Sequence, residues 1–511
     1  MVATAFPAAS EAGCEALRAG GNAVDAAVAA AWALCVCEPS GSGLGGHTVA
    51  LVHRPGSAAT LVDGHSRAPA AVSRRAVTRA QQRAGYTACT IPTTPAVLAH
   101  AQRRYGVLQP EGVIAPAIRL AREGYEITPL QRRQLRWCRD RLAATPGGRR
   151  FLAPTGAPWR VGDVFRQPGL ASALERIAVA GADDFYAGGI ARAIVEDMRR
   201  NGGLLDAHDL ASASEPAERE PLAAPYGAFR LVTAPPPGGG VELLVALKLL
   251  AALGGSTPDA APPDWYARMA VATRAAFTER ERRPVEPSQW SQALAAELID
   301  DRRIDSLCGS IHGGTPVTVG AGVEEAGETT HVCAADDDGN WVSLTQSIQS
   351  LFGAKVANDR FGFLYNNYLL TCPRRRHAYR LRASGPARSN AAPTLVVDGD
   401  ARPLLAAGGA GSRRIVSAMA HLISGVLDRG ASLGEAVATP RVHARVRGAA
   451  WVERDALTPD LRLALERAGL EAAPKPPLSF CMGSVQAIAR QRDGTLVGAC
   501  DPRREGEPRG V

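Results

Sequence analysis

A candidate nucleophile stands at Thr329-Thr330-His331, where the sequence begins to alternate like a β-strand. A threonine hydroxyl is a weak nucleophile at neutral pH and needs a base beside it. Because β-branched residues are common in strands, the two threonines alone do not indicate a site. Ser347 and Gln349 lie in the next strand-like run, and their spacing of two places them on one face. This hairpin therefore carries a candidate nucleophile with polar neighbours.

A second candidate feature is the glycine-rich segment Gly408-Gly409-Ala410-Gly411-Ser412, between an expected strand and an expected helix. Backbone N–H groups that no side chain covers can converge on an oxygen anion at such a place. A nucleophile and an oxyanion site together are the parts that covalent acyl transfer requires.

Other motifs do not support a cofactor or a metal. The letters of Gly41 to Gly46 match a dinucleotide fingerprint, but they follow a helix and precede a strand, which is the wrong order. The acidic run 336–338 has Ser347 at its twelfth position, where a calcium loop needs glutamate. The sequence has no HExxH motif and no CxxC pair among its 10 cysteines. We expect no metal and no cofactor.

Composition excludes several classes of protein. The chain has 511 residues, is 46% hydrophobic and 21% charged, and so is expected to fold as a globular protein. The net charge of +8 comes from scattered arginines with only 5% aromatic residues, which does not favour nucleic-acid binding. The longest apolar run, 26–37, is too short to cross a bilayer. Residues 1–20 lack the basic and apolar regions of an export signal, so we expect a cytoplasmic protein.

The pattern of apolar residues predicts an α+β fold with two helical layers around stacked antiparallel strands. Loose segments are expected at 254–264 and, as a linker, at about 309–328. The expected helices are 8–18, 23–36, several within 95–136, 170–180, 190–200, 241–253, 414–428 and 460–468. The expected strands are 49–53, 60–62, 329–335, 341–348, 394–397 and 404–407, with a hairpin turn at 336–340.

Several ordered segments together resemble a known family, the γ-glutamyltranspeptidases, which are N-terminal-nucleophile hydrolases. They include EAGCEALRAGGNAVDAAVAAAWALCVCEPSGSGLGG, RYGVLQPEGVIAPAIRLAREGYEIT, GADDFYAGGIARAIVEDMRRNGGLLDAHDL, PPPGGG, TTHVCAADDDGNWVSLTQSIQSLFG, PTLV and GGAGSRRI. The resemblance covers nearly the whole chain. It implies a four-layer αββα sandwich.

The resemblance also implies self-cleavage between Glu328 and Thr329. The products would be a large fragment 1–328 and a small fragment 329–511, held together as a heterodimer and forming one composite domain. Cleavage frees the α-amine of Thr329, whose ordinary pKa of about 8 lets it accept the hydroxyl proton. The mature enzyme would then form an acyl-enzyme on Thr329 and release it to water or to an amine.

The same resemblance gives roles to further residues. Gly411 and Ser412 stand where paired glycines hold the oxyanion, Ser347 where a threonine supports the nucleophile, and Gln349 where the family has asparagine. The remaining positions that correspond to substrate contacts are His65, Asn367, Thr371, Ser389 and Asn390.

These substrate positions depart from the pattern of members that use glutathione. His65 replaces the arginine that binds the glutamyl carboxylate, with Arg67 displaced by two positions. The double asparagine 366–367 is followed by Tyr-Leu-Leu-Thr, without the aspartate that binds the α-ammonium group. Ser389-Asn390 replaces paired serines. We therefore expect a small substrate other than glutathione.

The resemblance extends to branches of the family that cleave oxamate, that are acylases, or that hydrolyse a carbon–carbon bond in alkylproline antibiotic pathways. An oxalyl or amide-bearing intermediate of secondary metabolism fits these branches, and the basic residues between 374 and 388 could attract an anion at the lid. Two alternatives stay open: a true γ-glutamyl hydrolase in which Arg67 or Arg388 replaces the missing arginine, and an uncut, inactive binding protein.

Overall fold

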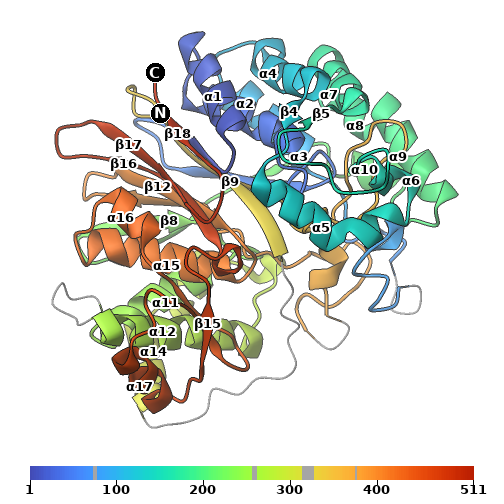
Figure 1. Ribbon diagram of the computed structural model, residues 1–511. Coiled ribbons are helices and arrows are strands. Elements are labelled where there is room, and N and C mark those ends of the chain that lie inside the picture. Colours follow the sequence, from blue (N-terminus) through green and yellow to red (C-terminus); the bar gives the residue numbers. More distant parts are fainter. Residues whose placement is uncertain (73–76, 256–261, 313–326, 374–376) are drawn as a thin grey trace. The chain divides into compact units, whose positions relative to one another are not determined.

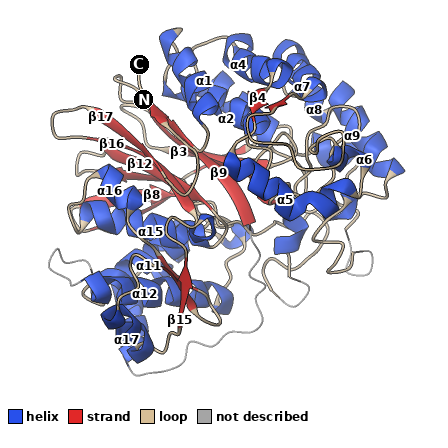
Figure 2. Ribbon diagram, in the orientation of Figure 1, coloured by secondary structure: helices blue, strands red, loops and turns tan. Residues whose placement is uncertain are grey.

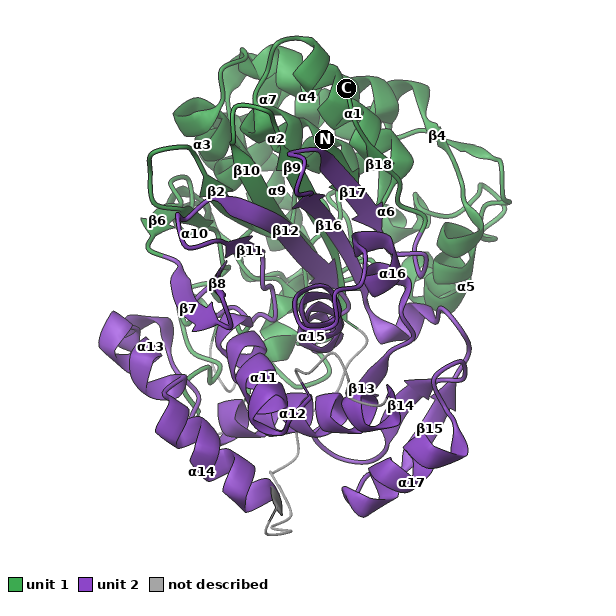
Figure 3. Cartoon of the chain, turned by 90° about the vertical axis from the view of Figure 1, so that its left-hand side faces the viewer, with its two compact units in different colours: residues 1–220, 327–388, 505–511 green, residues 221–326, 389–504 purple. Residues whose placement is uncertain are grey.

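The computed structural model describes residues 1–72, 77–255, 262–312, 327–373 and 377–511. The chain divides into two compact units, of which unit 1 comprises 1–220, 327–388 and 505–511 and unit 2 comprises 221–326 and 389–504 (Figure 3). Each unit therefore draws on both sides of the predicted cut before Thr329. Helices and antiparallel sheets occur in both units, which confirms the α+β class (Figures 1 and 2).

Unit 1 is built on a sheet with the strand order β18-β1-β9-β10-β2-β3-β6, in which every pairing is antiparallel. A short antiparallel pair, β4 with β5, forms a separate two-stranded sheet. The strands of unit 1 are β1 (Val2–Thr4), β2 (His47–His53), β3 (Thr60–Asp63), β4 (Tyr125–Glu126), β5 (Val164–Phe165), β6 (Ala217–Arg219), β9 (Gly327–Ala335), β10 (Trp341–Ser350) and β18 (Pro508–Arg509).

The helices of unit 1 gather on one side of this sheet (Figure 2). They are α1 (Pro7–Arg18), α2 (Ala23–Cys37), α3 (Thr94–Tyr105), α4 (Pro110–Glu123), α5 (Pro129–Ala143), α6 (Pro146–Arg149), α7 (Pro168–Ala180), α8 (Asp183–Tyr186), α9 (Gly189–Arg200) and α10 (Ala207–Ala211).

Helix α2 is the centre of the unit 1 core, because all fifteen of its residues are buried. It begins with a capping box in which the Asn22 side chain accepts from the N–H groups of Val24 and Asp25, while Asp25 accepts from the Asn22 N–H. The apolar side chains of one face of β9 and β10, among them Val332 and Leu344, pack in the same core. The opposite face of these strands carries the candidate nucleophile.

Unit 2 contains a second sheet, with the order β17-β16-β12-β11-β8-β7, and a small sheet β13-β14-β15. Its strands are β7 (Leu222–Tyr226), β8 (Phe229–Thr233), β11 (Thr394–Val397), β12 (Pro403–Ala410), β13 (Val442–Ala444), β14 (Ala450–Glu453), β15 (Ala472–Lys475), β16 (Ser484–Arg490) and β17 (Leu496–Cys500). Its helices are α11 (Gly240–Ala252), α12 (Pro262–Arg282), α13 (Gln292–Leu298), α14 (Asp301–His312), α15 (Arg414–Leu427), α16 (Leu433–Ala438) and α17 (Pro459–Arg467).

The expected linker 309–328 is partly wrong. Residues 309–312 continue α14, because Ile304, Leu307 and Ile311 recur at helical spacing and pack in the core of unit 2. Gly327 and Glu328 already belong to β9, and 313–326 lie outside the described residues. The loose segment expected at 254–264 likewise ends earlier, since α12 begins at Pro262, and its residues 256–261 are not described.

Candidate active site

Thr329 lies at the centre of a β-bulge between β9 and β10. The register passes from Thr330 opposite Gln346 to Glu328 opposite Gln349, so Ser347 and Ile348 together face Thr329. The Gln346 amide donates to the Ala31 carbonyl of α2, at 2.9 Å, which fixes the face of β10 that meets the helices. Because side chains alternate, Thr329 and Ser347 occupy the other face.

Ser347 connects the hydroxyl of Thr329 with the peptide bond before it. Its Oγ lies 3.2 Å from Thr329 Oγ1 and donates to the carbonyl oxygen of Glu328 at 2.8 Å. The N–H of Gln349 donates to the same Oγ at 3.0 Å. Gln349 adopts a φ of 81°, which is uncommon outside glycine and turns its N–H back toward Ser347. The bulge therefore holds one hydroxyl between a nucleophile and the carbonyl next to it.

The Glu328 side chain also belongs to this arrangement. Its Oε1 accepts from the Thr329 backbone N–H at 3.2 Å, and both residues are buried. Gly41 lies close to this peptide, since a β-carbon there would be 3.3 Å from the Thr329 carbonyl oxygen. At the other end of the same glycine-rich segment, a β-carbon on Gly46 would lie 2.6 Å from the Ser347 carbonyl oxygen. Gly41 and Gly46 thus allow close packing beside the bulge.

Asn366 and Asn367 are engaged with the backbone around the bulge. Asn366 donates to the carbonyls of Gly45 and Thr90, at 2.8 and 2.9 Å. The Asn367 amide donates to Ser350 Oγ at 3.0 Å and its oxygen accepts from the Ser350 N–H at 3.1 Å. These bonds use the amide of Asn367 to hold the end of β10. Its predicted contact with a substrate stays a prediction.

The segment after Asn367 carries no acid, as the sequence showed. Thr371 ends a short 3₁₀ turn, and its hydroxyl donates to the Tyr368 carbonyl at 2.9 Å. The Tyr368 ring stacks on His47 with the ring centroids 4.1 Å apart. Of the basic lid residues, 374–376 lie outside the described residues.

His65 follows β3 and is held by Asp63. Its Nδ1 lies 2.7 Å from Asp63 Oδ1, and Asp63 also pairs with Arg219. Burial would raise the pKa of the Asp63 carboxyl, but His65 and Arg219 outweigh it and keep that pKa below its usual range. Arg67 is exposed and donates to the Ser212 carbonyl at 3.2 Å.

The other predicted residues belong to unit 2. The β12 ladder ends at Ala410 opposite Ser484, and Gly411 and Ser412 follow with φ values of 120° and 60° before α15 begins. A β-carbon on Gly411 would lie 2.9 Å from the Gly483 Cα. The backbone N–H groups of Gly411 and Ser412 thus stand beyond the end of the strand, and their predicted oxyanion role stays a prediction.

Ser389 and Asn390 are positioned by an arginine that sequence reasoning missed. Arg280 in α12 donates to Asn390 Oδ1 and to the Ser389 carbonyl, both at 2.6 Å, and its Nε faces Glu242 at 3.3 Å. Asn390 in turn donates to Ser412 Oγ at 3.3 Å. The one sequence feature that could have indicated Arg280 is a charged side chain within a helix that also carries many apolar residues, with Glu242 in a similar position in α11.

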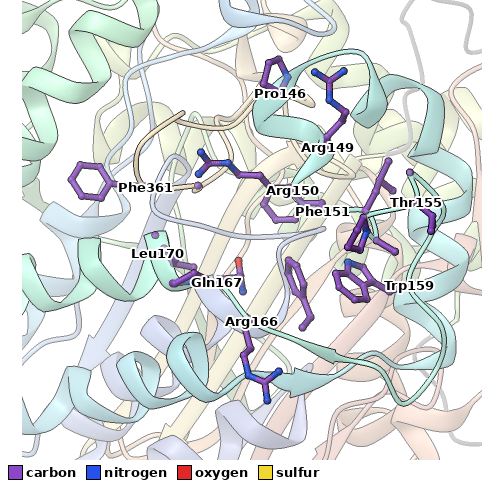
Figure 4. Close-up of a pocket in the computed structure, with 18 residues that line it drawn as sticks. Pro146, Arg149, Arg150, Phe151, Thr155, Trp159, Arg166, Gln167, Leu170 and Phe361 are labelled. Atoms are coloured by element: carbon purple, nitrogen blue, oxygen red, sulfur yellow. The ribbon is translucent and has the colours of Figure 1, made fainter.

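A separate pocket of about 770 Å³ lies in the helical part of unit 1 (Figure 4). Figure 4 shows Phe151 and Trp159 along its wall, with Arg149, Arg150 and Arg166 around it. Its lining contains none of the residues that the sequence singled out.

Within the described ranges, no three His, Cys, Asp or Glu side chains gather as metal ligands. None of the described helices has the length and apolar character needed to cross a membrane. Each of the ten cysteines lies in the described ranges, and none of them forms a disulfide.

Comparisons with known proteins identify the family of the chain. Residues 9–511 match the Gamma-glutamyltranspeptidase family. The chain is 30% identical to the glutathione hydrolase proenzyme of Escherichia coli K12, over 98% of this chain and 90% of the relative. It is 32% identical to the Acylase ACY 1 proenzyme of Pseudomonas sp. SE83, over 99% of this chain and 93% of the relative.

A solved structure of a related enzyme has the same fold. The cephalosporin acylase of Bacillus halodurans superposes with a TM-score of 0.87 at 29% identity, covering 99% of this chain and 94% of the acylase. The α+β fold expected from the resemblance, that of the N-terminal-nucleophile hydrolases, is thereby confirmed. The chain is an enzyme that belongs to the Gamma-glutamyltranspeptidase family.

Proposed function

We propose that this enzyme is a self-processing threonine hydrolase or acyltransferase that works through an acyl-enzyme on Thr329. The observation that carries the proposal is the Ser347 hydroxyl, which lies 3.2 Å from the Thr329 hydroxyl and donates to the Glu328 carbonyl at 2.8 Å. A nucleophile beside a polarised carbonyl is the arrangement that attack on that peptide requires. The proenzyme relatives support the same interpretation.

Processing would begin with an N-to-O acyl shift. The Thr329 hydroxyl attacks the Glu328 carbonyl carbon and loses its proton, while the Ser347 hydroxyl stabilises the charge that develops on the carbonyl oxygen. The C–N bond then breaks, the nitrogen takes up a proton, and an ester joins Glu328 to Thr329 Oγ1. Water hydrolyses this ester, which leaves fragment 1–328 with a new carboxylate and fragment 329–511 with a free α-amine.

The strand pairings support a heterodimer after the cut. In unit 1, β9 and β10 of the small fragment pair with β1 and β2 of the large fragment. In unit 2, β11 of the small fragment pairs with β8 of the large one. Because these ladders do not depend on the Glu328–Thr329 peptide, the two fragments are expected to stay associated.

In the mature enzyme, the α-amine of Thr329 would serve as the base for its own hydroxyl. The hydroxyl attacks the substrate carbonyl, the acyl group moves to Thr329 Oγ1, and the leaving group departs with the proton. Water or an amine then takes the acyl group. We assign Gly411 and Ser412 the oxyanion role that the family resemblance implies.

We further propose that the substrate is small and is not glutathione. Support comes from His65, which stands in the place of the arginine that binds the glutamyl carboxylate in members that use glutathione. Further support comes from the 368–371 segment, which has no carboxylate for an α-ammonium group. An oxalyl or amide-bearing intermediate of secondary metabolism is the class we favour. The ten cysteines form no disulfide in the structure, which accords with a cytoplasmic location, and that location is part of the same proposal.

Processed enzyme should be incubated with γ-glutamyl, oxamate-like and α-keto-acid compounds, and the products identified by mass spectrometry. We expect turnover of the second or third group and little of the first. Rapid release of 4-nitroaniline from a γ-glutamyl anilide would favour the γ-glutamyl hydrolase instead. A protein that stays uncut and acts on none of them would favour the inactive binding protein.

A further inference from the structure

Three buried imidazole nitrogens of His47 and His65, two neighbouring side chains, have no hydrogen-bond partner among the described residues. Among the described residues, neither Nδ1 nor Nε2 of His47 has one, and neither has Nε2 of His65. The two rings lie edge to face, with centroids 5.4 Å apart. His47 is 1% exposed, and the His65 side chain is 4% exposed. Buried polar groups are normally paired, so an occupant with polar atoms of its own would satisfy nitrogens that the protein does not pair.

The position of His47 places it next to the chemistry. His47 begins β2 directly opposite Ser347 of β10, and Ser347 Oγ is 3.2 Å from Thr329 Oγ1. Residues opposite one another in an antiparallel pair point to the same face, with β-carbons about 5 Å apart. His47, Ser347 and Thr329 therefore form a row on one face of the sheet. An acyl group bound to Thr329 would extend along that row.

The surroundings fix both rings. His65 is held by the Asp63 carboxylate, which pairs with Arg219 as well. His47 is held by stacking on Tyr368 at 4.1 Å. Burial, and then the neighbouring His65, keep the pKa of His47 well below its usual range, so this ring is neutral and offers one N–H and one lone pair. The Asp63 carboxylate is already bound on both sides and is not available to an ammonium group.

We propose that His47 and His65 form the subsite that recognises the acyl part of the substrate, and that its ligand is an acyl group carrying carboxylate or keto oxygens and no ammonium group. The inference rests on the proposed function, because it takes Thr329 as the nucleophile. It goes further in naming His47 as a substrate contact and in naming the chemistry that the pair accepts. An ammonium group has only donors and is bound well by a carboxylate, which this subsite does not offer.

The test compares three 4-nitroanilides that differ only at the far end of the acyl chain. Glutaryl and γ-glutamyl anilides differ by one α-ammonium group, and the valeryl anilide has neither charge. The wild type is expected to cleave the glutaryl compound with a kcat/KM at least about tenfold above the other two. In His47→Phe, which keeps a stacked ring but removes both nitrogens, we expect the ratio of the glutaryl to the valeryl kcat/KM to fall about 10- to 100-fold.

Two controls keep the result specific. His53→Phe makes the same substitution at the far end of the same strand, opposite Trp341, and should leave the ratio of glutaryl to valeryl cleavage unchanged. Denaturing electrophoresis reports whether each variant is cut before Thr329. A failure of the proposed function therefore appears as an uncut chain, whereas a failure of the subsite appears as an unchanged ratio of glutaryl to valeryl cleavage. A fully processed His47→Phe enzyme with the wild-type ratio would overturn the subsite.

Calorimetry provides a readout that does not depend on turnover. Glutarate, oxamate and valerate are titrated into the wild type and into His47→Phe. We expect glutarate or oxamate to bind the wild type at least tenfold more tightly than valerate, with the advantage lost in the variant. A wild type that binds neither better than valerate, or a variant that keeps the advantage, contradicts the proposal.

Discussion

The Ser347 hydroxyl donates to the carbonyl oxygen of Glu328 at 2.8 Å, at the bulge in the pairing of β9 with β10. The acceptor is the carbonyl of the peptide expected to break. Ser347 is therefore placed to act on processing itself, and not only on the orientation of Thr329.

Replacing Ser347 should slow the self-cleavage. Ser347→Ala removes the donor to Glu328, and loss of one oxyanion donor typically reduces a rate about 100- to 1,000-fold. Ser347→Thr keeps the hydroxyl and should process close to the wild-type rate. The measurement is a time course of the uncut chain by denaturing electrophoresis after rapid purification. Equal rates for Ser347→Ala and the wild type would show that the hydrogen bond has no role in processing.

Gly46→Ala should disturb the bulge by displacing the backbone of β10 at Ser347. The added β-carbon would lie 2.6 Å from the Ser347 carbonyl oxygen, closer than such atoms approach, so β10 must shift. We expect slower processing and a lower unfolding temperature. Gly112→Ala is the matched control, because no atom lies within 4 Å of its β-carbon and it stands within α4. That change should raise stability by about 0.5–1 kcal/mol and leave processing unchanged.

Ser412→Gly should stabilise the folded chain. Ser412 has a φ of 60°, a conformation that costs a residue with a β-carbon about 1–2 kcal/mol relative to glycine. Since its assigned oxyanion role uses the backbone N–H, activity should be kept. Chemical unfolding and steady-state kinetics on the same samples test both statements. A loss of activity without a gain in stability would point instead to a role for the Ser412 hydroxyl, which accepts from Asn390.

Stability should fall as the pH drops below about 6.5. Burial lowers the pKa of His331, His421 and His443 to about 3, so the folded chain stays unprotonated where unfolded histidines, with a pKa of about 6.5, bind protons. Burial also raises the pKa of two carboxyls, that of Asp197 to about 6 and that of Asp209, and these oppose the effect. Two carboxyls do not balance the three histidines together with His47 and His53, whose pKa burial also lowers. The unfolding midpoint should therefore decrease between pH 7 and pH 5. A midpoint that rises over this interval contradicts the assignment of these rings as buried and neutral.

The sequence predicted the elements that local chemistry specifies. The spacing of Asn22 and Asp25 indicated the start of α2, and the Asp338-Gly339 step indicated the hairpin turn, in which Asp336 caps the Asn340 N–H. The 21-residue helix α12 was missed, because its buried alanines and scattered charges give no clear amphipathic stripe. A helix buried on several sides carries little periodic signal.

The geometry of the site depends on features that the residue pattern does not specify. The alternation of β10 predicted a shared face for Ser347 and Gln349, but it does not contain the bulge that interrupts the alternation and places two residues opposite Thr329. The sequence pattern does not single out His47, since only the pairing of β2 with β10 places it opposite Ser347. Long-range register of this kind is set by tertiary packing, and a single sequence does not contain it in readable form.

The most direct test of the central claim is the intact mass and N-terminal sequence of the purified protein. The account predicts two fragments from the 53.4 kDa chain, of which the smaller begins at Thr329 and spans 329–511, while Thr329→Ala remains whole. A wild type that stays a single chain, or a Thr329→Ala variant that is cut at the same peptide bond, would contradict Thr329 as the nucleophile.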